Sequence, residues 1–392
     1  MAISSKRTPA LFYLGTLISS VGGMTLQISL VAFMLHIGFT LLQVGIVVGL
    51  SRLLPLVVSV FLGQRMDKFS PRKTIFWTEL GAGASSTLLL CCWVFFSHNF
   101  PMLLCAMILR SLFTSLQMGS RAQMAKILSD SSYKSNSRNA VWLNKVTQGA
   151  TLFGGALSWL AIQFATFPAV IVFDALTFVI NGVILSVLPI DDPGTGNAQA
   201  DPVLKKFRDL YQFNFRAALL DGFLALSIMG TSAFTARLAG ADESWIPLFV
   251  ISYGLSVWVA GYLERIAFVQ RQRAALWILL SGSFVLLGLI PGPGAAAWIV
   301  CLAKDTAFWI LFHRISAHIQ IDTPKNMIGA VTFARNAQLI TILAVGEMVV
   351  GFWKNVVPLP LECGLRAGVC IIVALTVAAK ALPVGNYEKA HL

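Results

Sequence analysis

The side chains of this chain that could do chemistry are charged residues inside long apolar runs. Each lies well away from the ends of its run: Arg110, Lys145, Arg335, Asp174, Asp221, Asp305 and Glu347. An arginine holds a carboxylate or phosphate through paired N–H donors. A carboxyl group in apolar surroundings can take up and release a proton. The pattern therefore predicts anion binding and proton transfer.

Composition excludes most classes of soluble protein. Hydrophobic residues make up 57% of the 392 residues and charged residues 12%, with a mean hydropathy of +0.77. A soluble domain carries roughly 25% charged residues, so this chain has too few polar groups to cover a water-exposed surface. We therefore exclude a soluble enzyme, a disordered protein and a nucleic-acid binder. The net charge of +12 fits excess Lys and Arg in cytoplasmic loops.

No catalytic or metal-binding motif is evident. The sequence lacks HExxH, GxSxG and P-loop patterns, and its 6 cysteines show no CxxC spacing. Most of these cysteines lie in apolar runs, where they act as small hydrophobic side chains. We therefore expect no enzyme activity, no cofactor and no bound metal.

Twelve apolar stretches are long enough to cross a bilayer, which takes about 20 apolar residues in a helix. They cover 9–36, 41–62, 74–96, 101–121, 139–163, 168–190, 214–238, 245–266, 275–290, 296–315, 328–352 and 362–382. Several junctions are turns rich in Pro, Gly or Asn, such as 291–294. The sequence thus predicts an all-α polytopic membrane protein with twelve transmembrane helices.

The distribution of Lys and Arg indicates the orientation. With the N-terminus inside, 21 of the 29 basic residues fall in cytoplasmic segments, and only Arg237, Lys354 and Arg366 fall in outer ones. Basic residues favour the cytoplasmic side of short loops. We therefore expect both termini, and the long polar segment 191–213, to be cytoplasmic.

The segment 191–213 also divides the spans six and six. We expect an N-terminal six-helix bundle over 1–190, a cytoplasmic central loop over 191–213 and a C-terminal six-helix bundle over 214–392. The end of this loop, KKFRDLYQFNFR, fits an amphipathic interfacial helix or a plain linker equally well. An internal repeat supports the division, because Lys145 and Gln148 recur as Arg335 and Gln338 at an offset of 190.

The segment after the second span, GQRMDKFSPRK, resembles the G-x-L-a-D-r-x-G-r-R-k loop of the major facilitator superfamily. The matching residues are Gly63, Asp67, Lys68, Arg72 and Lys73. The resemblance implies two pseudo-symmetric six-helix bundles that work by alternating access. It also implies that the matching residues gate the cytoplasmic side, with Asp67 capping a helix or pairing with a basic residue when that side closes.

Within this superfamily the chain is similar to the bacterial exporter branch that holds the enterobactin exporter and macrolide efflux pumps. The similarity rests on Asp174–Phe178 in the sixth span and on Met327–Gly329 at the start of the eleventh. The antiporter motif G-P-x-x-G-G appears as ATLFGG from Ala150, without its first Gly and its Pro. The resemblance implies an exporter in a bacterial inner membrane.

By the same resemblance, spans one, four, seven and ten line a central cavity. The expected substrate-binding residues are Arg110, Lys145, Arg335, Gln27 and Gln117. The expected proton-coupling residues are Asp305, Asp221, Asp174 and Glu347, each of which could instead be a buried ion-pair partner. Because Arg110 and Asp305 lie at mirrored depths, we expect them to neutralise each other across the empty cavity.

Together these features predict a proton-coupled exporter of a small anionic organic solute, such as a siderophore, acting as a monomer. A multidrug or macrolide-type efflux pump and a lipid or lysophospholipid transporter stay open as alternatives. The expected partners are the solute, protons and the lipid bilayer, with no nucleic acid.

Overall fold

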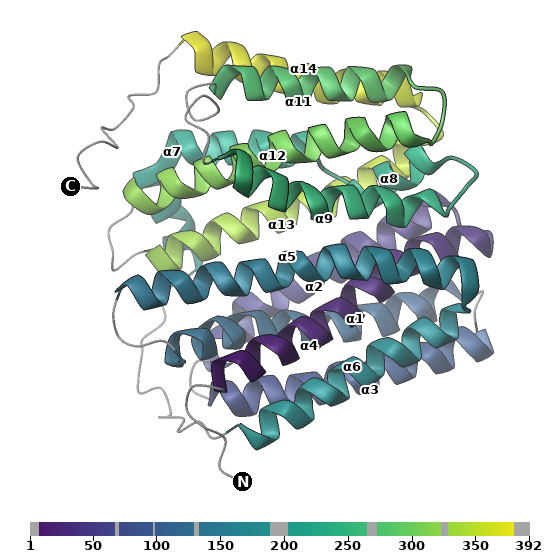
Figure 1. Ribbon diagram of the computed structural model, residues 1–392, viewed down its shortest axis with the longest axis vertical. Coiled ribbons are helices and arrows are strands. Elements are labelled where there is room, and N and C mark those ends of the chain that lie inside the picture. Colours follow the sequence, from purple (N-terminus) through teal and green to yellow (C-terminus); the bar gives the residue numbers. More distant parts are fainter. Residues whose placement is uncertain are drawn as a thin grey trace.

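The computed structural model describes residues 8–66, 70–96, 99–128, 133–188, 203–264, 273–322 and 328–379, and these residues form helices joined by turns (Figure 1). The helices are α1 (Thr8–His36), α2 (Leu41–Met66), α3 (Pro71–Phe96), α4 (Phe100–Ile127), α5 (Tyr133–Phe164), α6 (Phe167–Val187), α7 (Val203–Ser227), α8 (Thr231–Ala239), α9 (Trp245–Leu263), α11 (Arg273–Leu289), α12 (Ala295–Asp322), α13 (Ile328–Trp353) and α14 (Leu359–Ala379).

The twelve predicted spans all correspond to apolar helical segments. Among the described residues, 9 helical segments are long and apolar enough to cross a membrane. The remaining spans match three shorter apolar segments, Leu41–Leu54, Gly149–Phe164 and Ala275–Leu289. The predicted all-α, twelve-span membrane fold is therefore confirmed.

Helices α1–α6 form one group and α7–α14 another, one above the other in Figure 1. In the first group α1 packs on α5 and α6, α3 packs on α4 and α6, and α2 packs on α4. In the second group α7 packs on α13 and α14, α11 packs on α12 and α14, and α9 packs on α12. The packing of the first group thus recurs in the second, as the internal sequence repeat predicts.

The two ends of the bundle are named here after the ends of α1, as the Thr8 face and the His36 face. At the His36 face α1 stops at Gly38, whose φ of +94° suits a residue without a side chain. The backbone N–H of Phe39 then donates to the carbonyl of Met34 over 3.0 Å. At the same face α6 begins at Phe167, and its second residue, Pro168, is tolerated in the first helical turn because no partner exists there for its missing N–H.

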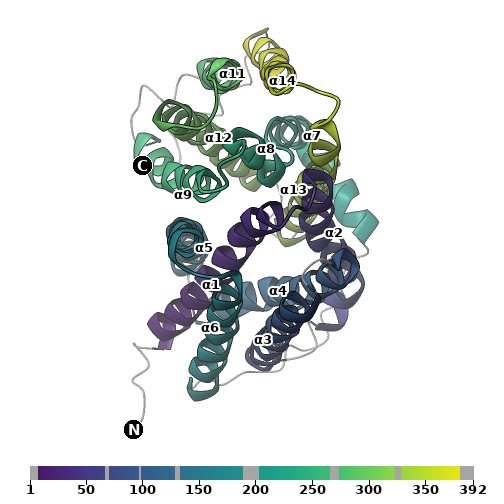
Figure 2. The same cartoon turned by 90° about the vertical axis from the view of Figure 1, so that its right-hand side faces the viewer.

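The two groups touch through α2 against α13 and α5 against α9, and Figure 2 shows both pairs side by side. Their backbones come so close that only glycine fits. A Cβ on Gly45 of α2 would lie 2.3 Å from the carbonyl oxygen of Glu347, and a Cβ on Gly254 of α9 would lie 2.8 Å from the amide nitrogen of Leu152. These glycines allow direct packing between the groups without interleaved side chains.

The seventh span is not the single helix predicted over 214–238. It ends as α7 at Ser227 and restarts as α8 at Thr231. Between them Gly230 has a φ of +66°, and a Cβ on it would lie 2.5 Å from the carbonyl oxygen of Gly346 on α13. Hydropathy is continuous across Asn214–Ala239, so the apolar pattern carries no sign of the break. At the break the chain lies directly against the backbone of α13.

The segment before this span is helical. Residues 203–213 form the first part of α7, which kinks at Asn214, where φ is −131° and ψ is 29°. The hydroxyl of Tyr211 donates to Oε1 of Gln338 on α13 over 3.0 Å. The segment is therefore a helix and not a plain linker. The rest of the predicted central loop lies outside the described residues.

Candidate functional site

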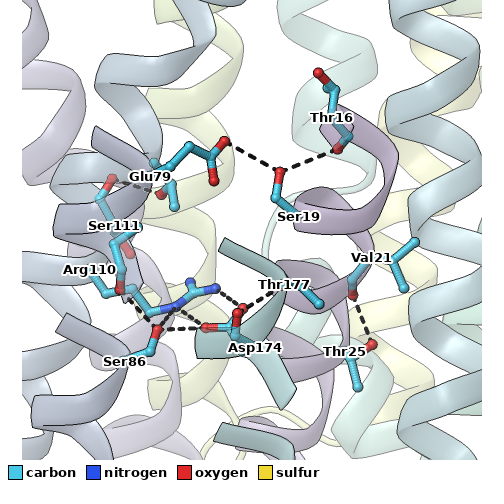
Figure 3. Close-up of polar contacts among 12 residues, drawn as sticks. Thr16, Ser19, Val21, Thr25, Glu79, Ser86, Arg110, Ser111, Asp174 and Thr177 are labelled. Carbon is cyan, nitrogen blue, oxygen red and sulfur yellow. Dashed lines mark hydrogen bonds and ion pairs between the residues drawn. The ribbon is translucent and has the colours of Figure 1, made fainter. Parts of the chain in front are cut away.

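Arg110 on α4 lies inside the first group and is 4% exposed. Its Nε and Nη2 atoms donate to the two carboxylate oxygens of Asp174 on α6 over 2.8 and 2.7 Å. Ser86 on α3 donates to Oδ2 of Asp174 over 2.6 Å. Figure 3 shows these three side chains meeting. A bidentate ion pair of this kind neutralises both charges away from water.

The predicted pairing of Arg110 with Asp305 is therefore wrong. Asp305 on α12 pairs with its neighbour Lys304 over 2.7 Å, and Oγ of Ser252 on α9 lies 3.4 Å from its other oxygen. Mirrored depth does not bring Arg110 and Asp305 together, because each charge finds its partner within its own group. Arg110 pairs with Asp174 on a helix of its own group, and Asp305 pairs with its neighbour on the same helix.

A second ion pair of the first group was missed from the sequence. Glu79 on α3 is 0% exposed, and its Oε1 accepts from Nη2 of Arg121 on α4 over 2.7 Å and from Nδ2 of Asn181 on α6 over 2.5 Å. Arg121 also donates to Ser19 and Ser20 of α1. Arg121, which the count of basic residues assigns to a cytoplasmic segment, has its side chain inside the bundle, 14% exposed. The signal that marks Glu79 is a lone acid inside an apolar span.

In the second group Arg335 on α13 holds Asp221 on α7. Its Nε and Nη2 atoms donate to the two oxygens of Asp221 over 2.8 and 2.7 Å. Its Nη1 donates to Ser316 over 2.7 Å, and its guanidinium carbon lies 4.4 Å from the ring centre of Phe312. One residue assigned to the substrate and one assigned to protons are thus joined in a single ion pair.

A cavity of about 150 Å³ lies beside this pair. Its wall is apolar except for one acid, Asp221, and it includes four aromatic side chains: Tyr253, Phe308, Trp309 and Phe312. The indole N–H of Trp309 is buried and has no hydrogen-bond partner among the described residues. An apolar cavity of about 150 Å³ takes one benzene-sized ring. The cavity can therefore hold an aromatic ring, and Trp309 in its wall keeps a donor without a partner among the described residues.

Glu347 on α13 caps the second half of the broken span. Its two oxygens accept the backbone N–H groups of Ser232 and Ala233 over 3.0 and 2.9 Å. The first turn of a helix leaves such N–H groups without internal partners, and its dipole favours a negative charge there. Arg52 on α2 donates to Oε1 of Glu347 over 3.1 Å, so this acid also links the two groups.

Arg366 on α14 supports the other side of the break. It donates to the carbonyls of Ser227 and Met229 over 2.8 Å each. Glu362 accepts from Arg366 and from Arg237 of α8. Arg237 and Arg366, which the count of basic residues assigns to outer segments, lie in helices α8 and α14, where they hold the two halves of the span.

A larger cavity of about 390 Å³ opens at the His36 face, between the two groups. Leu35, Phe39 and Leu41 form its wall on the first group. The charged residues that line it are Arg237, Glu243 and Lys354, all from the second group. Two basic side chains against one acid give this cavity a net positive lining.

Part of the predicted site cannot be placed. Asp67 and Lys68 lie outside the described residues. Gly63 lies in α2 and Lys145 in α5, but their surroundings fall outside the described part of the chain.

The other predicted gating residues hold the ends of helices at the Thr8 face. Arg72 donates to the carbonyls of Leu185 and Ser186 at the end of α6, over 3.0 and 2.6 Å. A basic group there satisfies carbonyls that have no helical partner. The backbone N–H of Lys73 donates to Oγ of Ser70 over 3.3 Å, as in a helix cap.

Charges inside the spans are almost balanced. Gln27 on α1 is half-buried and Gln117 on α4 is fully buried, so both predicted glutamines lie within the bundle. In the described part of the chain, six span carboxylates pair with seven basic side chains: Glu79, Asp174, Asp221, Asp305, Glu347 and Glu362 with Arg52, Arg110, Arg121, Arg237, Lys304, Arg335 and Arg366.

Two repeated groups of spanning helices, with charged side chains paired between them and within them, define a polytopic helical membrane protein of duplicated design. Residues 12–388 match the family model described as Major Facilitator Superfamily, and the chain belongs to this superfamily of transporters. No curated protein matches the chain in sequence.

Two solved structures illustrate the shared fold. A point mutant of the nucleoside transporter NupG is 10% identical with a TM-score of 0.74, over 95% of this chain and 99% of that one. A POT family transporter in complex with a thioalcohol-conjugated peptide is 11% identical with a TM-score of 0.73, over 95% of this chain and 96% of that one. At such identities the likeness concerns the fold.

Proposed function

We propose that this transporter exports a small anionic organic solute, such as a siderophore, in exchange for protons. The two groups would rock about the contacts of α2 with α13 and of α5 with α9, which exposes the space between them to each side in turn. Asp305, Asp221, Asp174 and Glu347 stay candidates for carrying the proton, because each is a buried acid. Of these four, Glu347 pairs across the two groups, with Arg52, so a rocking motion changes its pairing.

The charge balance supports an anion. Among the described residues, seven basic side chains pair with six carboxylates within the spans, so these ion pairs carry one surplus positive charge before any solute binds. The larger cavity at the His36 face has the same sign, with Arg237 and Lys354 against Glu243. An anionic group lowers the electrostatic cost of these surplus charges. This surplus is the observation on which the proposal depends.

An aromatic cation or a neutral drug is the second candidate, as in multidrug or macrolide-type efflux. Here the favouring observation is the smaller cavity, where Asp221 stands among Tyr253, Phe308, Trp309 and Phe312. Aromatic faces and a carboxylate attract cations, and Arg335, which pairs with Asp221, is not among the residues that line this cavity. An anionic solute would pair with Arg335, whereas a cationic solute would pair with Asp221 and compete with Arg335.

For orientation, we place the Thr8 face in the cytoplasm of a bacterial inner membrane, with both termini inside. The excess of Lys and Arg in the segments assigned to this side supports the proposal. Of the three basic residues assigned to outer segments, Lys354 is exposed, whereas Arg366 is buried and Arg237 is partly buried. Asp67, Lys68, Arg72 and Lys73 would then gate the inner side.

A ligand panel tests the solute class on purified protein. Salicylate, tetraphenylphosphonium, erythromycin and a lysophospholipid would each be added during thermal unfolding, because a ligand that binds the folded state raises the unfolding temperature. We expect salicylate to stabilise wild type and Arg208→Gln, an exposed-charge control, but to lose most of its effect in Arg335→Gln. Stabilisation by tetraphenylphosphonium alone would establish the second candidate.

Exchange is tested separately in proteoliposomes. Vesicles loaded with salicylate and an internal pH dye would be placed in acidic buffer. Coupled export predicts salicylate efflux together with internal acidification, both beyond the passive leak of protein-free vesicles. Efflux with no protein-dependent acidification would overturn proton coupling and leave the solute class standing.

A further inference from the structure

We propose that Glu79 is a proton-binding site, served by one water molecule held among Glu79, Asn181 and Arg121. The inference deepens the proton coupling proposed above, and it names a carboxyl group that is not among the acids considered there. It rests on three buried polar atoms that point to a small ligand.

Glu79 differs from the other span carboxylates because one of its two oxygens accepts no hydrogen bond from the described residues. Asp174 and Asp221 each give both oxygens to one arginine. Both oxygens of Glu347, Glu362 and Asp305 also contact donors. In Glu79 the donors gather at Oε1, while Oε2 is buried with no partner among the described residues. A proton can therefore bind Oε2 without displacing any existing donor.

Two more unpaired atoms lie at the same place. Oδ1 of Asn181 and Nε of Arg121 are buried and lack partners in the described part of the chain. Each shares its carbon atom with the nitrogen that donates to Oε1 of Glu79, Nδ2 for Asn181 and Nη2 for Arg121. The three unpaired atoms therefore belong to three side chains that meet at Oε1 of Glu79, and a buried polar atom left without a partner is unfavourable.

These atoms have the hydrogen-bonding complement of water. Oε2 of Glu79 and Oδ1 of Asn181 are acceptors, and the N–H at Nε of Arg121 is a donor. A water molecule offers two donors and accepts at its oxygen, and buried waters typically make about three hydrogen bonds. When a proton arrives, Oε2 of Glu79 takes it, the neutral acid donates back to the water oxygen or to Asn181, and the water is unchanged.

Three polar side chains face Glu79 among the described residues, and one of them, Arg121, is charged. α4 presents Arg121, α6 presents Asn181, and α1 presents Ser19, whose hydroxyl lies 3.4 Å from Oε1 (Figure 3). A further charged pair on these helices, Arg110 with Asp174, lies about 10 Å away along α6. Protonation would leave Arg121 facing a neutral acid and serine hydroxyls, which changes the charge at the contact of α3 with α4 by one unit.

The route to this site runs past Arg121. The side chain of Arg121 is 14% exposed, whereas that of Glu79 is 0% exposed. Arg121 also lies within about two turns of the end of α4 at the Thr8 face. A proton therefore reaches Glu79 from the Thr8 side in this conformation.

Infrared titration of the reconstituted protein tests the site with protons as the only probe. Lowering the pH should produce the C=O stretch of a buried protonated carboxylic acid in the wild type. We expect the same band in Asp242→Asn, which removes an exposed acid of the turn before α9, and its loss in Glu79→Gln. An unchanged titration in Glu79→Gln would overturn the proposal.

Asn181→Val keeps the inference testable should Glu79→Gln fail to fold. It retains Glu79 but removes an acceptor for the protonated acid and the water. The C=O band should move to higher frequency, and its midpoint pH should change; an unmoved band overturns the role of Asn181 and of the water. Because no solute is present, this result is independent of the panel that tests the solute class.

Discussion

At the scale of single residues, the membrane interior of this protein is organised by pairs. Arg110 with Asp174 and Arg335 with Asp221 are both two-pronged contacts between different helices of one group. Removing one member of such a pair leaves a charge in apolar surroundings, whereas removing both leaves only a packing change. Stability measurements on single and double variants therefore separate a structural pair from a functional one.

For the Arg110 pair we expect a marked asymmetry. Asp174→Leu alone should lower the free energy of unfolding by about 3–5 kcal/mol, because it leaves Arg110 buried without its partner. Adding Arg110→Met should restore most of that loss. Unfolding of purified protein in detergent measures both changes. Equal losses in the single and the double variant would contradict the pair as the source of the stability.

The unused donor of Trp309 gives a prediction about affinity. Trp309→Phe keeps an aromatic wall but removes the N–H, so a solute that accepts from it should bind about fivefold more weakly, equivalent to about 1 kcal/mol. Titration with the ligand of the panel that stabilises the protein, followed by thermal unfolding, measures the change. Trp258→Phe, at a 49% exposed position on α9, is the matched control and should bind as wild type does. Equal affinity in both variants would exclude this donor from the cavity's function.

At the scale of elements, the broken seventh span is the most distinctive feature. Glu347 satisfies N–H groups at the start of α8, and Arg366 satisfies carbonyls at the end of α7, so both ends of the break carry a complementary charge. Arg52 attaches the first group to the same point. A discontinuous helix with satisfied ends can change its angle at the break without exposing backbone groups to lipid.

Gly230→Ala tests whether the break is required. The added methyl group would meet the carbonyl of Gly346 and hold a left-handed φ, so we expect a loss of several degrees in unfolding temperature and slower exchange. Gly368→Ala is the control, because its position in α14 has open space and a helical alanine is favoured by up to about 1 kcal/mol. If both variants were equally stable, the left-handed turn would carry no cost.

At the scale of the whole molecule, two groups of helices of like packing meet at backbone contacts. The contact of α2 with α13 includes Gly45 and the pair of Arg52 with Glu347, and the larger cavity lies nearby at the His36 face. The rocking motion proposed above would change the angle at this contact, because α2 and α13 belong to different groups. The orientation of these faces in the membrane decides which side that opening serves.

Thiol labelling of intact cells tests the orientation in a variant without native cysteines. Thr195→Cys lies in the predicted central loop, and Asn355→Cys lies in the exposed turn after α13 at the His36 face. An impermeant reagent should label Asn355→Cys from outside and label Thr195→Cys only after the cells are permeabilised. The reverse pattern would invert the topology and place the Thr8 face outside.

The sequence by itself determined the span count, the class of protein and the duplicated plan. These depend on local quantities, because about 20 apolar residues must cross a bilayer as a helix whatever their neighbours are. It also identified most of the buried charges, since a charge in an apolar run is visible without a structure. Arg110, Asp174, Asp221, Asp305, Arg335 and Glu347 were all found in this way.

Only the tertiary structure decided which charges meet. Partner choice depends on which helix faces touch, and residues distant in sequence such as Glu79 and Asn181 converge through packing alone. For that reason depth along a span suggested Arg110 with Asp305, while packing joined Arg110 to Asp174. The break at Gly230 also depends on packing, because there the chain lies against the backbone of α13 at Gly346. Hydropathy along the sequence carries no information about such a contact.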